Sequence, residues 1–276
     1  MKSTMWMLGI SGLAMVLAGC VTTPKNGVCE APAFEAKPAP GFPTGFLNKT
    51  LEGAQAMSRY VVYVPYNYTP DEAWPMIVFL HGAGERGSDG LIQSEVGIGT
   101  AIRRHADRFP AIVLMPQCPK DRFWDVILAD MEQAIAKTRE EYRIDQDRIY
   151  LTGLSMGGYG TWIWGATKTD TFAALMPICG GGALMDISGL SSLPLHETFG
   201  TLDERVKNLA KVPIWAFHGA DDEVVPPLRT KQMLRLVEEA GGNVKYTEYP
   251  KTGHNSWDKA YGHRKAIEWL LSQRRK

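Results

Sequence analysis

The sequence predicts an α/β fold with a mostly parallel central sheet and helices on both of its faces. Short apolar runs rich in β-branched and aromatic residues alternate along the chain with longer amphipathic segments. No hairpin signal joins consecutive runs, and parallel strands need the longer crossover connections that are present instead. The 276 residues are 45% hydrophobic and 22% charged, which suits one large domain with a full core.

The N-terminal part of the chain has a different character. Residues 1–19 have a basic start, an apolar run at 5–17 and a small-residue ending, which predicts a secretory signal peptide. Its Leu-Ala-Gly-Cys ending at Cys20 resembles a bacterial lipobox. That resemblance implies cleavage before Cys20, lipidation of its sulfur and anchoring to the cell envelope, at the outer membrane or cell surface. The alternative is an ordinary secreted protein with a chance cysteine. Residues 20–45 are proline-rich and predict an extended tether, and 46–276 form the expected domain.

The strands are expected where apolar runs end at glycine, proline or a polar turn, because buried strands favour such residues. They are residues 60–65, 76–80, 112–115, 149–151, 172–179, 212–218 and 244–249. The helices are expected at residues 126–142, 159–166, 226–240 and 258–273. Asp125 is the expected N-cap of the first helix, and a glycine pair ends the third. Residues 183–211 are irregular and polar, and we expect a short lid or rim there.

A candidate nucleophile follows the strand at 149–151, which we expect to be preceded by a turn at Asp145 and Asp147. The chain continues as Gly153-Leu154-Ser155-Met156-Gly157 and then a helix. A strand, sharp turn and helix are the context in which a G-x-S-x-G pattern exposes a strained serine above a helix N-terminus. The alternative is a structural turn made of glycine and serine.

A serine hydroxyl needs a base to take its proton and an acid to orient that base. Asp222 follows the strand at 212–218, and His254 lies in the loop before the last helix. The order Ser155, Asp222, His254, each after a strand, is that of the α/β-hydrolase fold. Asp221 and Glu223 compete with Asp222, which is favoured by the pattern His-Gly-x-x-Asp-x-x-Val-Pro.

Five other histidines compete with His254. His81 and His218 precede glycine at strand ends, which suggests packing and hydrogen bonding within turns. His105 lies among arginines on an expected solvated face, and His263 falls in the last helix. His196 lies in the irregular segment, where it could contact substrate. Only His254 combines a loop position with a preceding glycine that lets the imidazole reach the serine.

The glycine-rich loop that begins at His81 is the expected second part of the site. It lacks the Lys-Ser/Thr of a phosphate-binding loop. Because it directly follows a strand, we expect the backbone N–H of Ala83 to form an oxyanion hole with that of Met156. The alternative is a tight turn without a role for its amides.

Several side chains beside these loops are candidates for substrate binding. Trp124, Tyr159 and Trp257 could stack on a phenolic acid or a sugar ring, and Glu85 lies in the glycine-rich loop. The alternative is that they are packing residues, with Glu85 paired to Arg86.

Composition and cysteine usage exclude several function classes. The formal net charge is zero, so there is no electrostatic case for nucleic acid. Behind Cys20 remain Cys29, Cys118 and Cys179, an odd number whose pairing is open. Cys118 and Cys179 follow apolar runs and suit small buried side chains. The spacing fits no metal site, and no cofactor motif is present.

Taken together, these motifs resemble α/β-hydrolases of the esterase and prolyl-oligopeptidase-like group, including predicted peptidases and the feruloyl and acetylxylan esterases of carbohydrate esterase family one. The resemblance implies acyl transfer through a covalent serine ester, without metal or cofactor, on small acyl, phenolic or carbohydrate-linked esters. A serine peptidase and a non-catalytic binding protein on the same scaffold remain the alternatives.

Overall fold

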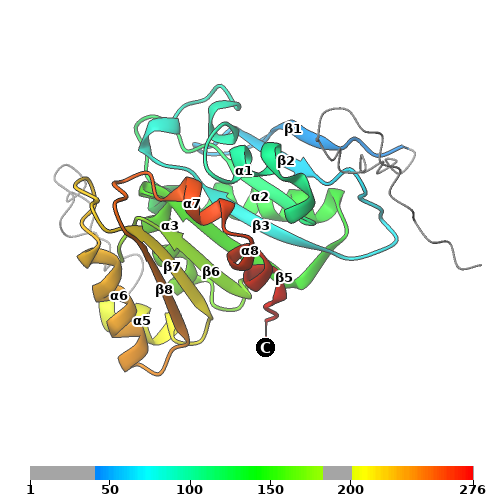
Figure 1. The fold of residues 1–276 in the computed structure, drawn as a ribbon. Helices are drawn as coiled ribbons and strands as arrows, with labels where there is room; N and C mark the ends of the chain where they lie inside the picture. Colours follow the sequence, from blue (N-terminus) through cyan, green and yellow to red (C-terminus); the bar gives the residue numbers. More distant parts are fainter. Residues whose placement is uncertain (1–40, 183–200, 276) are drawn as a thin grey trace, which may run out of the picture. The chain divides into compact units, whose positions relative to one another are not determined.

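The computed structural model describes residues 41–182 and 201–275. The predicted signal peptide, Cys20, Cys29, His196 and most of the predicted lid lie outside the described residues. Within them the strands form one eight-stranded sheet in the order β1-β2-β4-β3-β5-β6-β7-β8 (Figure 1). The strands are β1 (Gly45–Thr50), β2 (Arg59–Val64), β3 (Trp74–Leu80), β4 (Ile112–Pro116), β5 (Ile144–Leu154), β6 (Ala174–Ile178), β7 (Ile214–Gly219) and β8 (Val244–Tyr249).

Pairing is parallel from β4 across to β8, whereas β2 joins β4 and β1 joins β2 in antiparallel fashion. The prediction of a mostly parallel sheet is therefore confirmed. Because the carboxyl ends of parallel strands lie at one edge, the loops after β3, β5, β7 and β8 meet there.

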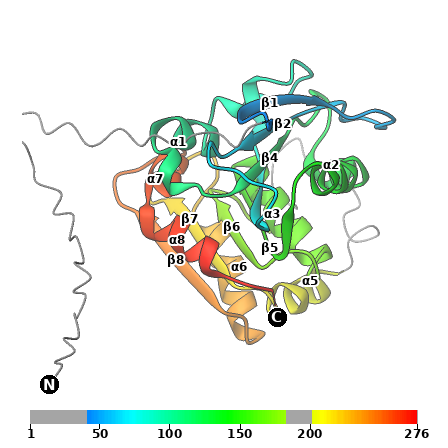
Figure 2. The same cartoon turned by 90° about the vertical axis from the view of Figure 1, so that its right-hand side faces the viewer.

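Helices cover both faces of the sheet, as Figures 1 and 2 show from two sides. One face carries α1 (Ile98–Arg104), α7 (Trp257–Gly262) and α8 (Arg264–Ser272), and the other carries α2 (Leu128–Glu141), α3 (Met156–Thr167), α5 (Leu202–Leu209) and α6 (Leu228–Glu239). None of these described helices has the length and apolar character needed to cross a bilayer.

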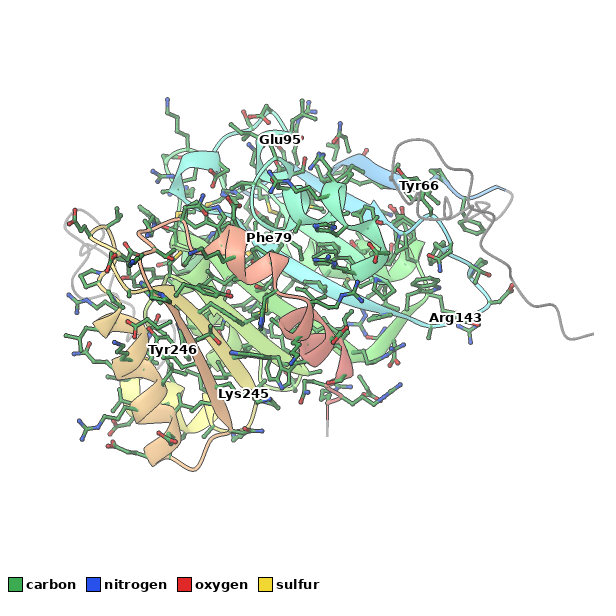
Figure 3. The ribbon with its side chains drawn as sticks, viewed as in Figure 1. Tyr66, Phe79, Glu95, Arg143, Lys245 and Tyr246 are labelled. Atoms are coloured by element: carbon green, nitrogen blue, oxygen red, sulfur yellow. The ribbon has the colours of Figure 1, made fainter. Side chains whose placement is uncertain are left out.

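The strand period of two divides the core between these faces. In β3, Val78 packs with the α2 and α3 side, whereas Phe79 packs with the α7 side, where its ring meets Tyr261 edge-on at 5.8 Å (Figure 3). Adjacent residues of β8 also point to opposite faces of the sheet. Lys245 lies over the ring of Trp215, whereas the ring of Tyr246 lies under the ammonium of Lys231. A buried parallel sheet needs apolar residues on both faces, which explains the continuous apolar runs in the sequence.

One strand and two α-helices of the described residues were not predicted, because their sequence signals are weak or short. Strand β1 is a half-exposed edge strand with little apolar character, and it is held by pairing with β2. Helix α1 is only 7 residues long. Helix α5 lies within the segment expected to be irregular, and its capping box between Thr201 and Glu204 was the signal that could have found it.

Three aspartates have roles other than those predicted. Asp125 is not an N-cap: it is buried inside a 3₁₀ turn at Trp124–Ile127, and α2 begins after this turn without a side-chain cap. Asp145 and Asp147 do not form a turn, because both lie within β5. The register of β5 against β3 shifts at this point, so the strand continues past the polar residues.

The predicted last helix is also divided at His263 into α7 and α8.

Asp130 on α2 links this helix to the chain between β1 and β2. Its carboxylate is buried and accepts hydrogen bonds from the backbone N–H groups of Gln55, Ala56 and Met57 at 2.9, 2.8 and 2.8 Å. We expect Asp130→Ala to lower the free energy of unfolding by about 2–3 kcal/mol, because buried amides lose a charged acceptor. Urea denaturation measures this loss. The control Glu140→Ala, exposed on the same helix, should change stability by less than about 0.5 kcal/mol, and an equally small effect of Asp130→Ala would contradict the assignment.

Candidate active site

A sharp turn between β5 and α3 carries Ser155. Its backbone has φ 52° and ψ −117°, a conformation that residues other than glycine rarely adopt. The flanking glycines make this turn possible, since a Cβ on Gly157 would lie 1.9 Å from the carbonyl oxygen of Leu80 and one on Gly153 would lie 2.3 Å from that of Gly157. Close packing of backbone on backbone therefore forces the turn and presents the Ser155 hydroxyl at the start of α3.

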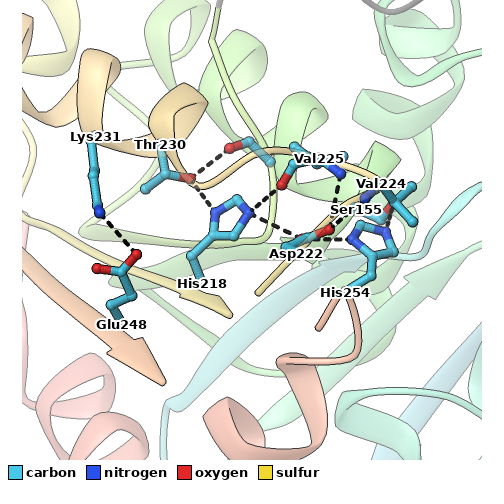
Figure 4. Close-up of polar contacts among 10 residues, drawn as sticks. Ser155, His218, Asp222, Val224, Val225, Thr230, Lys231, Glu248 and His254 are labelled. Carbon is cyan, nitrogen blue, oxygen red and sulfur yellow. Dashed lines mark hydrogen bonds and ion pairs between the residues drawn. The ribbon is translucent and has the colours of Figure 1, made fainter. Parts of the chain in front are cut away.

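The structure brings the other two predicted triad side chains to this hydroxyl. His254, in the loop after β8, places Nε2 2.9 Å from the Oγ of Ser155, while its Nδ1 lies 2.8 Å from Oδ2 of Asp222, in the loop after β7 (Figure 4). Since a carboxylate only accepts, Nδ1 carries the hydrogen and Nε2 is free to take the serine proton. This is the geometry that a nucleophile, a base and an orienting acid require.

Asp222 is 4% exposed, and its two oxygens are fully used. Oδ1 accepts the backbone N–H groups of Val224 and Val225 at 3.0 and 2.9 Å, and Oδ2 faces His218 as well as His254. Its neighbours Asp221 and Glu223 are exposed. The structure therefore places Asp222, rather than either rival, against the imidazole.

The glycine-rich loop lies beside Ser155, since a Cβ on Gly82 would lie 3.6 Å from the Cβ of Ser155. The Nε2 of His81 accepts the N–H of Cys118 at 2.9 Å, so Nδ1 carries the hydrogen and donates to the carbonyl of Gly82 at 2.6 Å. Burial lowers the pKa of His81 to about 4, which keeps the ring neutral. Because C=O and N–H of one trans peptide point in opposite directions, the N–H of Ala83 faces away from His81.

The two predicted oxyanion amides both begin helical turns. Ala83 starts the 3₁₀ turn Ala83–Glu85, and Met156 starts α3. Amides at such positions have no acceptor within their own helix, and the dipole of α3 adds positive potential at Met156. The arrangement can therefore offer two N–H donors to an oxygen bound next to Ser155.

Glu85 lies at the end of this loop rather than in a pair with Arg86, whose guanidinium stacks on the ring of Phe123 at 5.0 Å. The Oε2 of Glu85 is 4.0 Å from the Nδ1 of His81 and has no hydrogen-bond partner among the described residues. Burial raises the pKa of this carboxyl group.

The predicted aromatic residues differ in their exposure. Trp124 is 2% exposed, donates from Nε1 to the carbonyl of His81 at 3.0 Å, and packs edge-on against the His81 ring, so it supports the loop and cannot stack on a substrate. Tyr159 is also buried, beside Gly181. Trp257 is partly exposed, and its ring meets His254 edge-on at 5.5 Å, so it lies at the rim of the site.

Cys118 and Cys179 are buried free thiols. The sulfur of Cys179 and ligand atoms of Asp222 and His254 lie within 4.8 Å of one another. Burial raises the pKa of Cys179 to about 12, and Asp222 and His254 are hydrogen-bonded to each other, so we assign no metal to this group.

The predicted hydrogen bonding of His218 within its turn is confirmed, but its contact with Asp222 and the support from Thr230 were not predicted. The Nε2 of His218 lies 3.1 Å from Oδ2 of Asp222 and 2.8 Å from the carbonyl oxygen of Val225. The hydroxyl of Thr230 on α6 bridges Nδ1 of His218 at 2.8 Å and the carbonyl of Gly180 at 2.6 Å. The spacing of His218 and Asp222, four residues apart after a strand, was the available signal. The link to Thr230 had none.

Solved structures with the same fold include a thermostable esterase, 35% identical with a TM-score of 0.69, which covers 83% of this chain and 63% of its own. They also include a feruloyl esterase module from Clostridium thermocellum, 18% identical with a TM-score of 0.61 over 88% of this chain and 93% of its own. At this lower identity the similarity concerns the fold alone. The prediction of an α/β-hydrolase fold is thus confirmed.

Curated relatives match over part of their length. They include an uncharacterized secreted protein of Arthroderma benhamiae, 27% identical over 66% of this chain and 21% of its own length. A poly(3-hydroxybutyrate) depolymerase of Ralstonia pickettii is 24% identical over 58% and 36%. A bifunctional acetylxylan esterase/xylanase of Neocallimastix patriciarum is 28% identical over 52% and 21%. The chain thus spans between a fifth and just over a third of these relatives.

A family model gives the broadest assignment. The model of the prolyl oligopeptidase family matches residues 121–275, a span that contains Ser155, Asp222 and His254. Since this match covers more than half of the chain, the protein belongs to the prolyl oligopeptidase family.

Proposed function

We propose that the protein is a serine hydrolase that cleaves carboxylic esters through an acyl-enzyme. The observation that carries the proposal is the unbroken chain of contacts from the strained Ser155 to the Nε2 of His254 at 2.9 Å, and from its Nδ1 to Asp222 at 2.8 Å. A binding protein on this scaffold would have no need for such strain and alignment.

Acylation begins when the Oγ of Ser155 attacks the acyl carbon and its proton passes to the Nε2 of His254. The carbonyl oxygen becomes an oxyanion, which accepts hydrogen bonds from the backbone N–H groups of Ala83 and Met156. Each such donor typically accounts for about 10²–10³-fold in rate. The tetrahedral intermediate collapses as His254 gives the proton to the leaving alcohol oxygen, which leaves the acyl group esterified to Ser155.

Deacylation repeats these steps with water as the nucleophile. His254 takes a proton from water, the hydroxide oxygen bonds to the acyl carbon, and the proton returns to the Oγ of Ser155 as the acid leaves. Asp222 stays ionised, holds Nδ1–H and stabilises the transient imidazolium. No step requires a metal or a cofactor.

The relatives favour esters over peptides as substrates, since they include an acetylxylan esterase, a poly(3-hydroxybutyrate) depolymerase and a solved esterase. Within esters we propose small acyl or phenolic groups linked to a carbohydrate, with Trp257 at the rim as a stacking surface. The family name keeps a peptidase as the second candidate.

We also propose that the protein is exported and lipid-anchored through Cys20. The lipobox-like sequence supports this location, and a secreted relative agrees with export. Residues 20–45 then act as a tether between the lipid and the domain at 46–276.

Replacing the proposed nucleophile tests the function. Ser155→Ala should abolish labelling by a fluorophosphonate probe and lower the hydrolysis of p-nitrophenyl acetate by at least about 10³-fold, because it removes the oxygen that forms the acyl-enzyme. The control Ser272→Ala, exposed on α8, should behave as wild type. Equal labelling of wild type and Ser155→Ala would exclude the proposal.

The substrate class is tested by kcat/KM on matched pairs. A feruloyl or acetyl ester on a xylan oligosaccharide should be turned over at least about tenfold better than the corresponding methyl or ethyl ester, because the sugar adds binding energy that reaches the transition state. Equal rates would contradict the proposal of a carbohydrate-linked substrate. A faster rate on a prolyl peptide anilide would favour the peptidase over the esterase.

The anchor is tested in a bacterial host fed a radiolabelled fatty acid. Wild type should carry the label and sediment with membranes, and Cys20→Ser should carry none. Cys29→Ser is the matched control and should be labelled as wild type. An unlabelled wild-type protein in the soluble fraction would show that Cys20 is not an anchor.

A further inference from the structure

The carboxylate of Asp222 is bonded on the side away from His254 by a second histidine. His218 is the second-last residue of β7, its side chain is fully buried, and its Nε2 lies 3.1 Å from Oδ2 of Asp222 (Figure 4). The same Oδ2 accepts Nδ1–H of His254 at 2.8 Å. One carboxylate oxygen is therefore shared between two imidazoles, and the other is occupied by two backbone amides.

The surroundings of His218 determine which ring nitrogen donates. Nε2 faces two atoms that only accept, namely the carbonyl oxygen of Val225 at 2.8 Å and Oδ2 of Asp222. A nitrogen between two acceptors must carry the hydrogen. The opposite nitrogen, Nδ1, lies 2.8 Å from the hydroxyl of Thr230. This hydroxyl donates its hydrogen to the carbonyl oxygen of Gly180. The ring is thus clamped between α6, the end of β7 and the loop after β6.

Burial and the hydrogen bonds of His218 act in opposite directions on its pKa. Burial lowers the pKa of His218 below the ordinary histidine value, although the Val225 carbonyl and Asp222 oppose this effect. The other groups that face this cluster are His254 and Cys179, whose thiol is neutral because burial raises its pKa to about 12.

We propose that His218 is a positioning residue for the triad: its Nε2–H fixes Oδ2 of Asp222 so that the carboxylate is aligned with Nδ1 of His254. This inference rests on the proposed function of Ser155, Asp222 and His254. Thr230 and Gly180 extend the positioning to the loop that follows β6, so three segments of the chain set the orientation of one carboxylate.

The test compares two replacements of His218. His218→Phe removes the donor and keeps a ring, and it should lower kcat for p-nitrophenyl acetate by about tenfold or more, with KM within about twofold of wild type. Its pH–rate profile should also change. Without this donor, Asp222 holds the Nδ1 proton of His254 more tightly. The acid limb of the profile, where activity falls as the pH is lowered, should therefore move to higher pH by about 0.5–1 unit. His218→Gln, which keeps an N–H donor near the Nε2 position, should restore most of both effects.

The controls separate positioning from folding. The ring of His263 packs on Trp215 of β7, the strand that also carries His218. The control His263→Phe should leave kcat and the pH profile unchanged. If His218→Phe fails to fold, Thr230→Val replaces it and should shift the acid limb in the same direction by a smaller amount. A folded His218→Phe, or Thr230→Val in its place, with the wild-type kcat and pH profile would overturn the inference.

The two proposals fail in different ways. Wild type that is not labelled by a fluorophosphonate at Ser155 would overturn the proposed function and this inference together. Normal labelling of wild type, combined with equally fast labelling of His218→Phe across the pH range, would overturn this inference alone.

Discussion

The site depends on one close backbone contact. Gly157, at the start of α3, packs against the carbonyl of Leu80 at the end of β3 so tightly that no side chain fits between them. The contact forces Ser155 into a backbone conformation that costs about 1–3 kcal/mol, and the packed sheet must supply that energy. It also fixes the distance between the serine and the loop that begins at His81. Ser155 and the amides proposed for the oxyanion hole are thus positioned by the same packing of β5 and α3 on β3.

The second constraint is the burial of the Asp222 carboxylate. An isolated charge in such a place would cost several kcal/mol, so every lone pair needs a donor. The chain supplies two backbone amides from the following turn and two imidazoles from separate strand ends. This saturation orients the carboxylate, because rotation would break at least two hydrogen bonds at once. The charge then remains available to His254, the only partner that changes its protonation in the proposed reaction.

The sequence was most informative where local pattern and tertiary role coincide. Buried parallel strands have continuous apolar runs, and the turn at Gly153 and Gly157 has few structural solutions. The fold could therefore be predicted, as could the three side chains that the structure brings into contact. Edge strand β1 and short helix α1 depend on their neighbours and carry little signal. Whether an aromatic residue lines a cleft or packs beneath it depends on a few ångströms of loop geometry, so the burial of Trp124 could not be read from its position in the sequence. The contact between His218 and Thr230 joins a strand to a helix, and no spacing rule predicts it.

The most direct test of the central claim is a crystal structure of the protein after reaction with a phosphonate ester. We expect a covalent bond between phosphorus and the Oγ of Ser155, with the phosphonyl oxygen about 2.7–3.1 Å from the backbone nitrogens of Ala83 and Met156. His254 should still contact Asp222 in that adduct. An adduct on another residue, or a phosphonyl oxygen that points to solvent away from both amides, would contradict the central claim.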